Sequence, residues 1–341
     1  MMDLKKVTVI IPTRNEEKYI GKCLDSFVNQ SYPKELYEIF VVDGLSEDKT
    51  TEIVKEYNKK YKNIQLIINP GRIVPKGVNL GIKKSSADII ILFGAHAYAD
   101  KDFIKENVIS LENEEVGCSG GPITTISHDL KGAAIALAMS SPFGVGNALF
   151  RYAQKEIYVD TVAFGAYKRE VLEKVGYLDE ELVRNQDDEL NYRVIKNGYK
   201  ILLSPKIKST YYSRSSFKKL WNQYYQYGFW KVRVMQKHGK TASLRHLIPM
   251  AFVIYNLLGL ILSLINHHFM YLWLPEIAIY ILLDILFSFK LSNKNKKLLK
   301  YLPFVFPMLH ISYGLGFIEG LFSFYLLKNK RAVEKNTKLS R

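Results

Sequence analysis

The first two thirds of the chain alternate short apolar runs with longer segments of helical period. The apolar runs are rich in β-branched residues and lie at 7–11, 38–43, 63–69 and 88–93. The helical segments between them lie at 17–29, 48–61 and 75–86. Strands that alternate with helices at this spacing predict βαβ units and a mostly parallel sheet. Because the runs are continuously apolar, we expect strands buried on both faces, within an α/β domain over residues 1–205.

The pattern changes at Leu247, where the first of three long apolar runs begins. The runs lie at 247–266, 271–289 and 301–327. The first has 20 residues without a charge, which is enough to cross a hydrocarbon core of ~30 Å. The second contains Glu276 and Asp284, and the third contains two prolines and Glu319. We predict a membrane anchor over 247–327, with the third run either a full crossing or a hairpin.

Composition narrows the class of protein. Of the 341 residues, 48% are apolar and 13% aromatic, which excludes a disordered chain. The two cysteines, Cys23 and Cys118, are too few for a disulfide-stapled fold and are typical of a reducing compartment. The N-terminal apolar run is too short for a signal peptide, so none is predicted. The formal net charge of +15 is unevenly distributed along the chain.

Residues 206–246 join the two halves and combine basic with aromatic side chains, without an Asp or Glu. The basic residues are Lys206, Lys208, Arg214, Lys218, Lys219, Lys231, Arg233, Lys237, Lys240 and Arg245. Basic residues beside an apolar run are attracted to anionic lipid, and Trp and Tyr favour the headgroup level. We therefore predict amphipathic interfacial helices. The alternatives are a solvated charged face and nucleic-acid binding by base stacking, of which the second is not expected.

Charge also predicts the orientation in the membrane. Lys and Arg favour the cytoplasmic side, so we expect residues 1–246 and the Lys-rich loop 290–300 in the cytoplasm, with 267–270 as a short outer turn. A third full crossing would place the tail 328–341 outside, although it has six basic residues and one acid. That placement conflicts with the charge rule. We predict a multi-pass protein of the cell membrane with its N-terminal domain in the cytoplasm.

Two polar strings follow the first two predicted strands. They read PTRNEE (12–17) and VDGLSEDKT (42–50), and the dinucleotide motif GxGxxG is absent. Each string alone is also explained as a helix cap. Together they place polar groups at the carboxyl ends of neighbouring parallel strands, where open α/β sheets bind ligands. In this the chain resembles the family 2 glycosyltransferases of the GT-A fold, whose pattern is a strand, P-x-x-N-E, then a strand ending in a D-G-S turn.

The resemblance implies a nucleotide-sugar pocket at these strings. Its lining would comprise Pro12, Thr13, Arg14, Asn15 and Glu16. Asp43 would accept a hydrogen bond from the uracil or ribose, a role that suits a carboxylate because it accepts only and can take two donors. The string GVNLGI (77–82) resembles the family's A-x-N-x-G-I element and adds Asn79 to the pocket.

The family carries a D-x-D motif at the end of its fourth strand, where it holds a divalent metal against the diphosphate. Here the string is ILFGAHAYADKDF (91–103), with Gly94 at the first Asp and His96 at the last. Members of the succinoglycan-biosynthesis type have D-A-H-A, so His96 fits the type and Gly94 departs from it. The resemblance implies Mg²⁺ or Mn²⁺ with His96 as a ligand, although a lone His is also a common structural residue. Because these ions prefer oxygen donors, the lost carboxylate makes weaker metal dependence an alternative.

Three further strings resemble the succinoglycan type, in order along the chain: 141–151, 158–176 and 184–201. In the last, QDDEL (186–190) aligns with the family's E-D-x-D-L. This implies that Asp187 is the catalytic base, with Asp188 as the alternative. An inverting transfer needs one carboxylate to take the proton from the attacking hydroxyl, whereas a nucleoside diphosphate leaves without a second acid. Taken alone, acids at a helix start are explained by the helix dipole.

Gln226 and Trp230 share the spacing of the Q-x-x-R-W element that floors the acceptor channel in processive members, with Phe229 in place of Arg. The resemblance implies acceptor contacts for both residues. The same positions also suit an interfacial helix, so this signal is less specific than the strings before it.

As a whole, the resemblance implies an inverting hexosyltransferase. It would move a sugar from a nucleotide-diphosphate sugar, UDP-linked by expectation, to a lipid-linked oligosaccharide or polysaccharide precursor at the cytoplasmic membrane face. One alternative loads a single sugar onto polyprenyl phosphate; another is a non-catalytic, nucleotide-sensing membrane protein. The expected partners are the donor, the lipid-linked acceptor and anionic lipid. The expected divisions of the chain are 1–205, 206–246, 247–327 and the tail 328–341.

Overall fold

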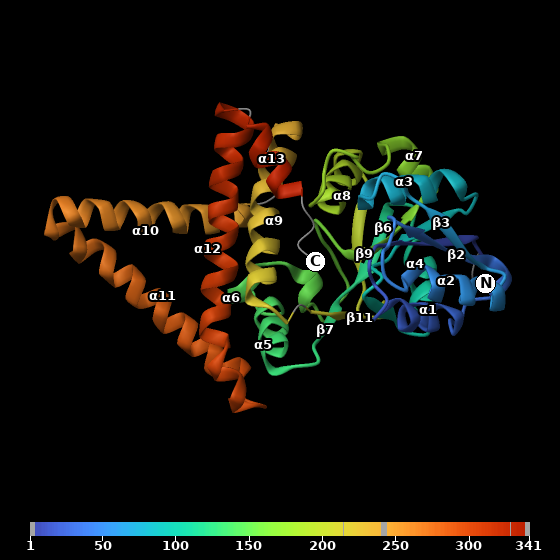
Figure 1. Ribbon diagram of the computed structural model, residues 1–341, viewed down its shortest axis with the longest axis horizontal. Coiled ribbons are helices and arrows are strands. Elements are labelled where there is room, and N and C mark those ends of the chain that lie inside the picture. Colours follow the sequence, from blue (N-terminus) through green and yellow to red (C-terminus); the bar gives the residue numbers. More distant parts are fainter. Residues whose placement is uncertain (1–3, 214, 240–243, 328, 338–341) are drawn as a thin grey trace. The chain divides into compact units, whose positions relative to one another are not determined.

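The computed structural model in Figure 1 describes residues 4–213, 215–239, 244–327 and 329–337. Arg214 and Lys240 of the predicted basic stretch lie outside the described residues, as do both ends of the tail.

The chain divides into two compact units. The first comprises Met1–Thr124 and Leu149–Tyr212, and the second Thr125–Ala148 and Ser213–Arg341. The chain passes into the second unit for the last time after Tyr212, whereas the sequence division was set after residue 205. The sequence division, however, placed 125–148 in the first domain, whereas this segment packs with the C-terminal helices.

The strands, in chain order, are β1 (Val7–Thr13), β2 (Tyr37–Asp43), β3 (Ile64–Ile68), β4 (Ile89–Leu92), β5 (Ala97–Ala99), β6 (Val116–Gly121), β7 (Ile123–Ile126), β8 (Ile157–Tyr158), β9 (Ala163–Lys168), β10 (Lys200–Leu203) and β11 (Ser209–Tyr212). The helices are α1 (Ile20–Val28), α2 (Thr50–Lys60), α3 (Val74–Lys84), α4 (Phe103–Ser110), α5 (Leu130–Met139), α6 (Pro142–Val145), α7 (Arg169–Val175), α8 (Gln186–Lys196), α9 (Phe217–His238), α10 (Ile248–Ile265), α11 (Met270–Leu291), α12 (Leu302–Leu321) and α13 (Lys330–Thr337). Short 3-10 turns lie at η1 (Lys34–Leu36), η2 (Leu149–Arg151), η3 (Leu244–His246), η4 (His267–Phe269) and η5 (Lys296–Lys300), and a π-helical turn, η6 (Phe322–Leu326), follows α12.

The main sheet of the first unit has the strand order β3-β2-β1-β4-β9-β6-β10-β8. Strands β1 to β4 pair in parallel, as do β6 and β10, while β9 runs antiparallel to β4 and β6. The predicted α/β fold with a mostly parallel sheet is therefore confirmed. Because parallel strands end at one edge, the polar strings after β1, β2 and β4 meet there.

Helices cover both faces of this sheet (Figure 1). Along β1, Val9 and Ile11 point into the cluster that α1, α2 and α4 complete, whereas Ile10 points into the cluster of α3, α7 and α8. Side chains alternate between faces along a strand, so a strand between two helical layers must be apolar at every position. This explains the continuous apolar runs in the sequence.

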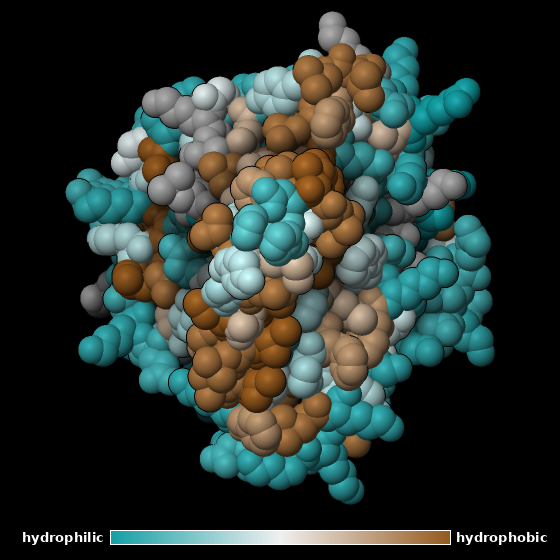
Figure 2. Space-filling view, turned by 90° about the vertical axis from the view of Figure 1, so that its left-hand side faces the viewer, coloured by the Kyte–Doolittle hydropathy of each residue, from teal (hydrophilic) through white to brown (hydrophobic). Residues whose placement is uncertain are grey.

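Among its described residues, the second unit contains three helices that are long and apolar enough to cross a membrane: Ile248–Ile265, His267–Leu291 and Leu302–Leu326. Figure 2 shows apolar side chains gathered over the C-terminal helices of this unit. In the third run α12 continues unbroken past Pro307. The hairpin considered from the sequence is therefore not formed within the described part of this run.

Candidate active site

Two loops interlock at the carboxyl ends of β1 and β2. Thr13 and Asp43 are neighbours in the parallel register, and Gly44 N donates to the Thr13 carbonyl at 2.8 Å. Asn15 adopts a left-handed φ of 54°, and its side-chain oxygen accepts from the Glu47 backbone N–H at 2.8 Å. This cross-link holds the two predicted polar strings side by side.

Asp43 lies at the base of these loops and is only 1% exposed. Its two carboxylate oxygens accept from Ser46, one from the backbone N–H at 2.9 Å and one from the hydroxyl at 2.5 Å. The Ser46 hydroxyl in turn accepts from the Asn15 backbone N–H at 2.9 Å. A carboxylate has about four acceptor positions, so Asp43 keeps capacity for ligand donors while Ser46 fixes its orientation.

The remaining residues of the first string take different positions in the loop. Pro12 pairs with Val42 in the sheet, and the Thr13 hydroxyl donates to the Ile11 carbonyl at 3.0 Å. Arg14 is partly exposed and lies 3.8 Å from the carboxylate of Glu47. The structure thus brings the string 12–16 and Asp43 to one edge of the sheet, and the nucleotide contacts implied for them stay predictions.

Glu16 faces His96, which lies in the loop between β4 and β5. Its backbone N–H donates to the Thr50 hydroxyl at 2.8 Å, and its carboxylate Oε1 lies 3.4 Å from Nδ1 of His96. The Glu16 side chain is 6% and that of His96 14% exposed, and the His96 ring packs edge-on against Tyr211. Burial raises the pKa of the neighbouring Cys23 thiol, and the charge of Glu16 raises it further.

Glu16 and His96 are the residues at this edge that could bind the metal implied by the resemblance. Within the described part of the chain, no group of three or more His, Cys, Asp or Glu side chains is placed to hold a metal ion. His96 and Glu16 supply one nitrogen and one carboxylate at this edge. Divalent ions at nucleotide sites are commonly held by one or two carboxylates with phosphate oxygens completing the shell. The pair fits a metal only together with a diphosphate.

Packing explains why position 94 is a glycine. A Cβ built at this position would come within 2.9 Å of the Phe164 ring edge and 3.5 Å of the His96 ring. The Phe164 ring packs at a tilt against Phe93, with ring centroids 4.4 Å apart, so Phe93 restricts its movement away from Gly94. The absence of a carboxylate at Gly94 therefore follows from the aromatic ring that fills its space.

The predicted base lies in the first turn of α8. Asp187 is exposed and Asp188 half-buried, and the Asp187 carboxylate accepts from the Asp188 backbone N–H at 3.0 Å. Asn185 precedes the helix with a left-handed φ of 59°. The helix dipole favours carboxylates in this turn in their charged form, which is the form a base requires. The role of base implied for Asp187, with Asp188 as the alternative, stays a prediction.

Tyr167 of β9 lies close to this helix start. Burial raises the pKa of its phenol, and the charges of Cys118 and then Asp187 raise it further. The phenol donates to the Asn191 side chain at 2.9 Å, which donates onward to Thr161 at 2.9 Å. The protonated hydroxyl thus belongs to a buried network that fixes α8 on the sheet.

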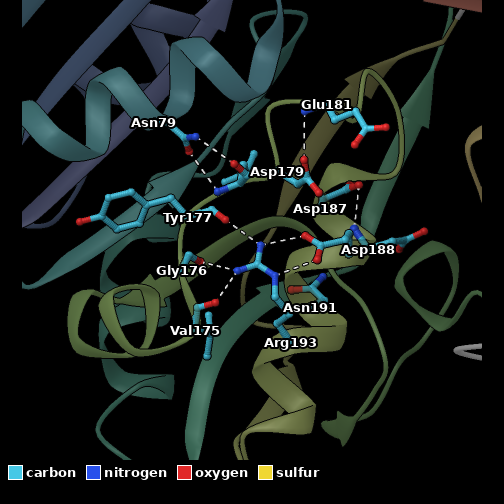
Figure 3. A network of polar contacts seen from close by, with 12 residues as sticks. Asn79, Val175, Gly176, Tyr177, Asp179, Glu181, Asp187, Asp188, Asn191 and Arg193 are labelled. Atoms are coloured by element: carbon cyan, nitrogen blue, oxygen red, sulfur yellow. Dashed lines mark hydrogen bonds and ion pairs between the residues drawn. The ribbon is translucent and has the colours of Figure 1, made fainter. Parts of the chain in front are cut away.

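A guanidinium anchors the segment before α8 (Figure 3). Arg193 donates to the backbone carbonyls of Val175, Gly176 and Tyr177, each at 2.6 Å. It also donates to both carboxylate oxygens of Glu189 at 2.8 Å. All five donors of the guanidinium are thereby used. Sequence reasoning missed Arg193; its i,i+4 spacing from Glu189 was the available signal.

Asn79 anchors the same segment from the other side (Figure 3). Its amide nitrogen donates to the Leu178 carbonyl at 2.9 Å, and its oxygen accepts from the Leu178 N–H at 3.0 Å. The amide nitrogen also donates to Glu180 at 3.0 Å. Asn79 was predicted as a nucleotide-pocket residue. Its side chain contacts the chain that leads to α8, and the nucleotide contact implied for it stays a prediction.

Gln226 and Trp230 lie in the second unit, where both side chains are packed. Gln226 is 6% and Trp230 1% exposed. The indole N–H of Trp230 donates to the Asn336 carbonyl at 3.0 Å, and its ring packs against Phe229 and Phe324. The structure gives Trp230 protein partners in place of an open face, and the acceptor contacts implied for these residues stay predictions.

Comparison with known proteins decides the family. The model of the family described as glycosyl transferase family 2 matches residues 8–176. A relative from Methanococcus voltae is 35% identical over 324 residues, covering 92% of this chain and 97% of that protein. The chain belongs to glycosyltransferase family 2. The resemblance inferred from the sequence and the enzyme class that it implied are confirmed.

The relatives of this glycosyltransferase differ in their named activities. The Methanococcus voltae protein is the dolichyl N-acetyl-alpha-D-glucosaminyl phosphate 3-beta-D-2,3-diacetamido-2,3-dideoxy-beta-D-glucuronosyltransferase. The succinoglycan biosynthesis protein ExoA of Rhizobium meliloti (strain 1021) is 26% identical over 265 residues, covering 76% of this chain and 78% of that protein.

Solved structures confirm the GT-A-like fold of the glycosyltransferase. The mannosyltransferase PcManGT from Pyrobaculum calidifontis, in complex with GDP-Man and Mn²⁺, superposes with a TM-score of 0.63 at 17% identity. The superposition covers 94% of this chain and 88% of that one. At this identity the likeness establishes the fold alone.

Proposed function

We propose that this glycosyltransferase moves a sugar, with inversion, from a nucleotide-diphosphate sugar to a saccharide carried on a polyprenyl lipid. One observation supports a lipid-linked acceptor. The similarity to the Methanococcus voltae enzyme, whose name gives a dolichyl N-acetyl-alpha-D-glucosaminyl phosphate as its acceptor, spans 92% of this chain. It therefore includes apolar helices as well as the catalytic unit. We propose a UDP-linked donor and reaction at the cytoplasmic membrane face.

The donor would bind at the interlocked loops of β1 and β2. Asp43, held by Ser46, would accept from the base or ribose, and Asn15 keeps the two loops together. His96 and Glu16 are the residues that would hold a divalent cation. Such a cation would stabilise the charge that develops on the leaving diphosphate.

Asp187 would act as the base, with Asp188 as the alternative. The acceptor hydroxyl attacks C1 of the donor sugar while its proton passes to the carboxylate. The bond from C1 to the diphosphate oxygen breaks, and the nucleoside diphosphate leaves with that electron pair. A single displacement from the opposite face inverts the configuration at C1. Exposure of Asp187 at the helix start leaves its carboxylate accessible to an acceptor.

The test uses the full chain purified in detergent with a panel of UDP- and GDP-sugars. Three acceptors are compared: polyprenyl phosphate N-acetylglucosamine, polyprenyl phosphate alone and free N-acetylglucosamine. We expect transfer to the first, with at least tenfold less to the others, and the inverted linkage in the product. Transfer to polyprenyl phosphate alone would instead identify a polyprenyl-phosphate glycosyl synthase. Donor binding without transfer or hydrolysis for any sugar would support a nucleotide-sensing protein.

A further inference from the structure

Helices α9 and α12 pack so closely that their backbones touch. A Cβ added at Gly228 of α9 would lie 2.0 Å from the Tyr313 carbonyl oxygen. A Cβ added at Gly316 of α12 would lie 2.0 Å from the Tyr225 carbonyl oxygen. Only glycine allows backbones to approach this closely. These two helices are therefore one rigid pair.

The pairing extends along both helices, which lie side by side in Figure 1. Near their beginnings, Leu220 and Tyr224 share a core cluster with α12 residues from Leu302 to Leu309. Near their ends, Gln236 donates to the Phe324 carbonyl at 2.9 Å. The two helices must therefore lie at the same depth relative to a bilayer: if α12 crossed it, α9 would cross it too.

Helix α9 cannot lie across a hydrocarbon core. It carries Lys218, Lys219, Lys231, Arg233 and Lys237 and no acid. Lys218 and Lys219 lie in its first turn and Arg233 and Lys237 in its last two turns, whereas Lys231 is buried. With Gln223 and Gln226 between them, α9 is not among the described helices that are apolar enough to cross a membrane. Lys and Arg at hydrocarbon depth are costly, whereas at the headgroup level they are attracted to anionic lipid.

The three apolar helices differ in what surrounds them. Only 6% and 11% of the first two candidate spans are buried inside the protein, against 44% of the third. Leu264 and Leu272, on either side of the α10–α11 turn, are 80% and 70% exposed. Helix α12 instead packs on α5, and its His310 is bonded to the Phe143 carbonyl at 2.8 Å. Helices α10 and α11 therefore have the surface of lipid-facing helices, whereas a large share of α12 is covered by the protein itself.

The chain after α12 returns to α9. Asn336 of α13 accepts from the indole of Trp230 and donates to Glu319 at 3.0 Å. Lys335 lies 3.8 Å from Glu319, which also accepts from the Tyr225 hydroxyl at 2.8 Å. Residues on opposite sides of a bilayer cannot make these contacts. The start of the tail lies on the side that α9 occupies.

We infer that the chain crosses the bilayer twice, by the α10–α11 hairpin, and that the α9–α12 pair lies along an anionic membrane surface on the side of the catalytic unit. All Lys and Arg segments then share one side, because residues 266–269 of the outer turn contain neither. The conflict of the tail 328–341 with the charge rule disappears. The length of α12 does not show that it crosses the bilayer. Its 20 residues, at ~1.5 Å per residue, form a helix of about 30 Å, which can equally lie along the membrane surface.

Single cysteines in the full chain test this topology. His267→Cys probes the outer turn, Lys294→Cys the loop before α12, Lys330→Cys the tail, and Lys60→Cys the catalytic unit; all four positions are exposed. The native Cys23 and Cys118 are fully buried, and burial raises the pKa of both thiols. Thiolate is the reactive form, so the parent chain should show little labelling by a membrane-impermeant maleimide.

In intact cells we expect labelling at His267→Cys alone, and at the other three positions only after permeabilisation. Labelling of Lys330→Cys in intact cells would show three crossings and overturn the inference. Labelling of His267→Cys only after permeabilisation would show that the hairpin does not cross, and would overturn it too. Arg331→Cys repeats the tail measurement if Lys330→Cys does not accumulate. The outcome is independent of the proposed reaction.

Discussion

Nδ1 of His96 lies 3.4 Å from Oε1 of Glu16, so the loop between β4 and β5 faces the loop after β1. If this pair holds a metal together with the diphosphate, Mn²⁺ should tighten nucleotide-diphosphate binding severalfold. His96→Ala should abolish most of that gain, as should Glu16→Gln, because each removes one donor. Calorimetric titration of UDP with and without Mn²⁺ measures the effect. An unchanged metal response in both variants would make the pair purely structural.

The role of Asp187 is tested by amide substitution. Asp187→Asn keeps the shape of the side chain but cannot take a proton, so transfer should fall by at least 10²-fold while nucleotide binding stays within twofold. Asp188→Asn is the matched variant one residue along the same helix turn. If Asp188→Asn loses the activity and Asp187→Asn keeps it, the base assignment moves to Asp188.

Substitutions at Asp43 and Ser46 distinguish a direct contact with the nucleotide from a role in supporting the loop. Asp43→Ala should weaken UDP binding by ~1.5–3 kcal/mol, roughly ten- to hundredfold in Kd. Ser46→Ala keeps the carboxylate and removes one of its two protein donors, so a smaller loss is expected. Equal losses in the two variants would indicate that Asp43 acts through the loop and not through the nucleotide.

Gly94 is predicted to reject a side chain because of Phe164. Gly94→Ala should lower the free energy of unfolding by ~1–3 kcal/mol, since the added carbon overpacks against the ring. Gly94→Asp should do the same, even though it restores a carboxylate at this strand end. Combining either change with Phe164→Ala should recover part of the loss. Additive losses in a double-mutant cycle would contradict direct contact between the two positions.

Arg193 is predicted to position the helix that carries Asp187. Arg193→Ala leaves Glu189, which is 3% exposed, as a buried charge without its guanidinium, and should destabilise the protein by ~3–5 kcal/mol. Arg193→Lys keeps a positive charge but cannot reach three carbonyls and a carboxylate together. In that variant we expect kcat to fall while Kd for the nucleotide is kept. A loss in nucleotide affinity alone would contradict a positioning role at α8.

Much of the fold was predictable because the relevant information is local. The runs at 7–11 and 38–43 are apolar at every position because the strands that they form lie between two helical layers. The strings after them are polar because they end at the open edge of the sheet. Spacing along the chain was enough to bring 12–16 and Asp43 together, since neighbouring parallel strands end side by side.

Other features depend on contacts between residues far apart in the chain. Phe164 lies 70 residues after Gly94, and no local pattern indicates that its ring fills the space of a missing carboxylate. Asn79 matched a family element, but its amide is bonded to Leu178, 99 residues away. In both cases the partner is chosen by the path of the chain across the sheet.

By itself, the sequence determined the α/β class, the edge of the sheet where polar groups gather, the family and the presence of long apolar helices. Each of these follows from periodicity or from contiguous motifs. Tertiary structure alone decided which apolar helices face outward. Hydropathy counts apolar side chains without stating what covers them, and α12 is covered by α9 and α5 whereas α10 and α11 are largely not. The partner of an apolar surface is a property of packing, and packing exists only once the chain has folded.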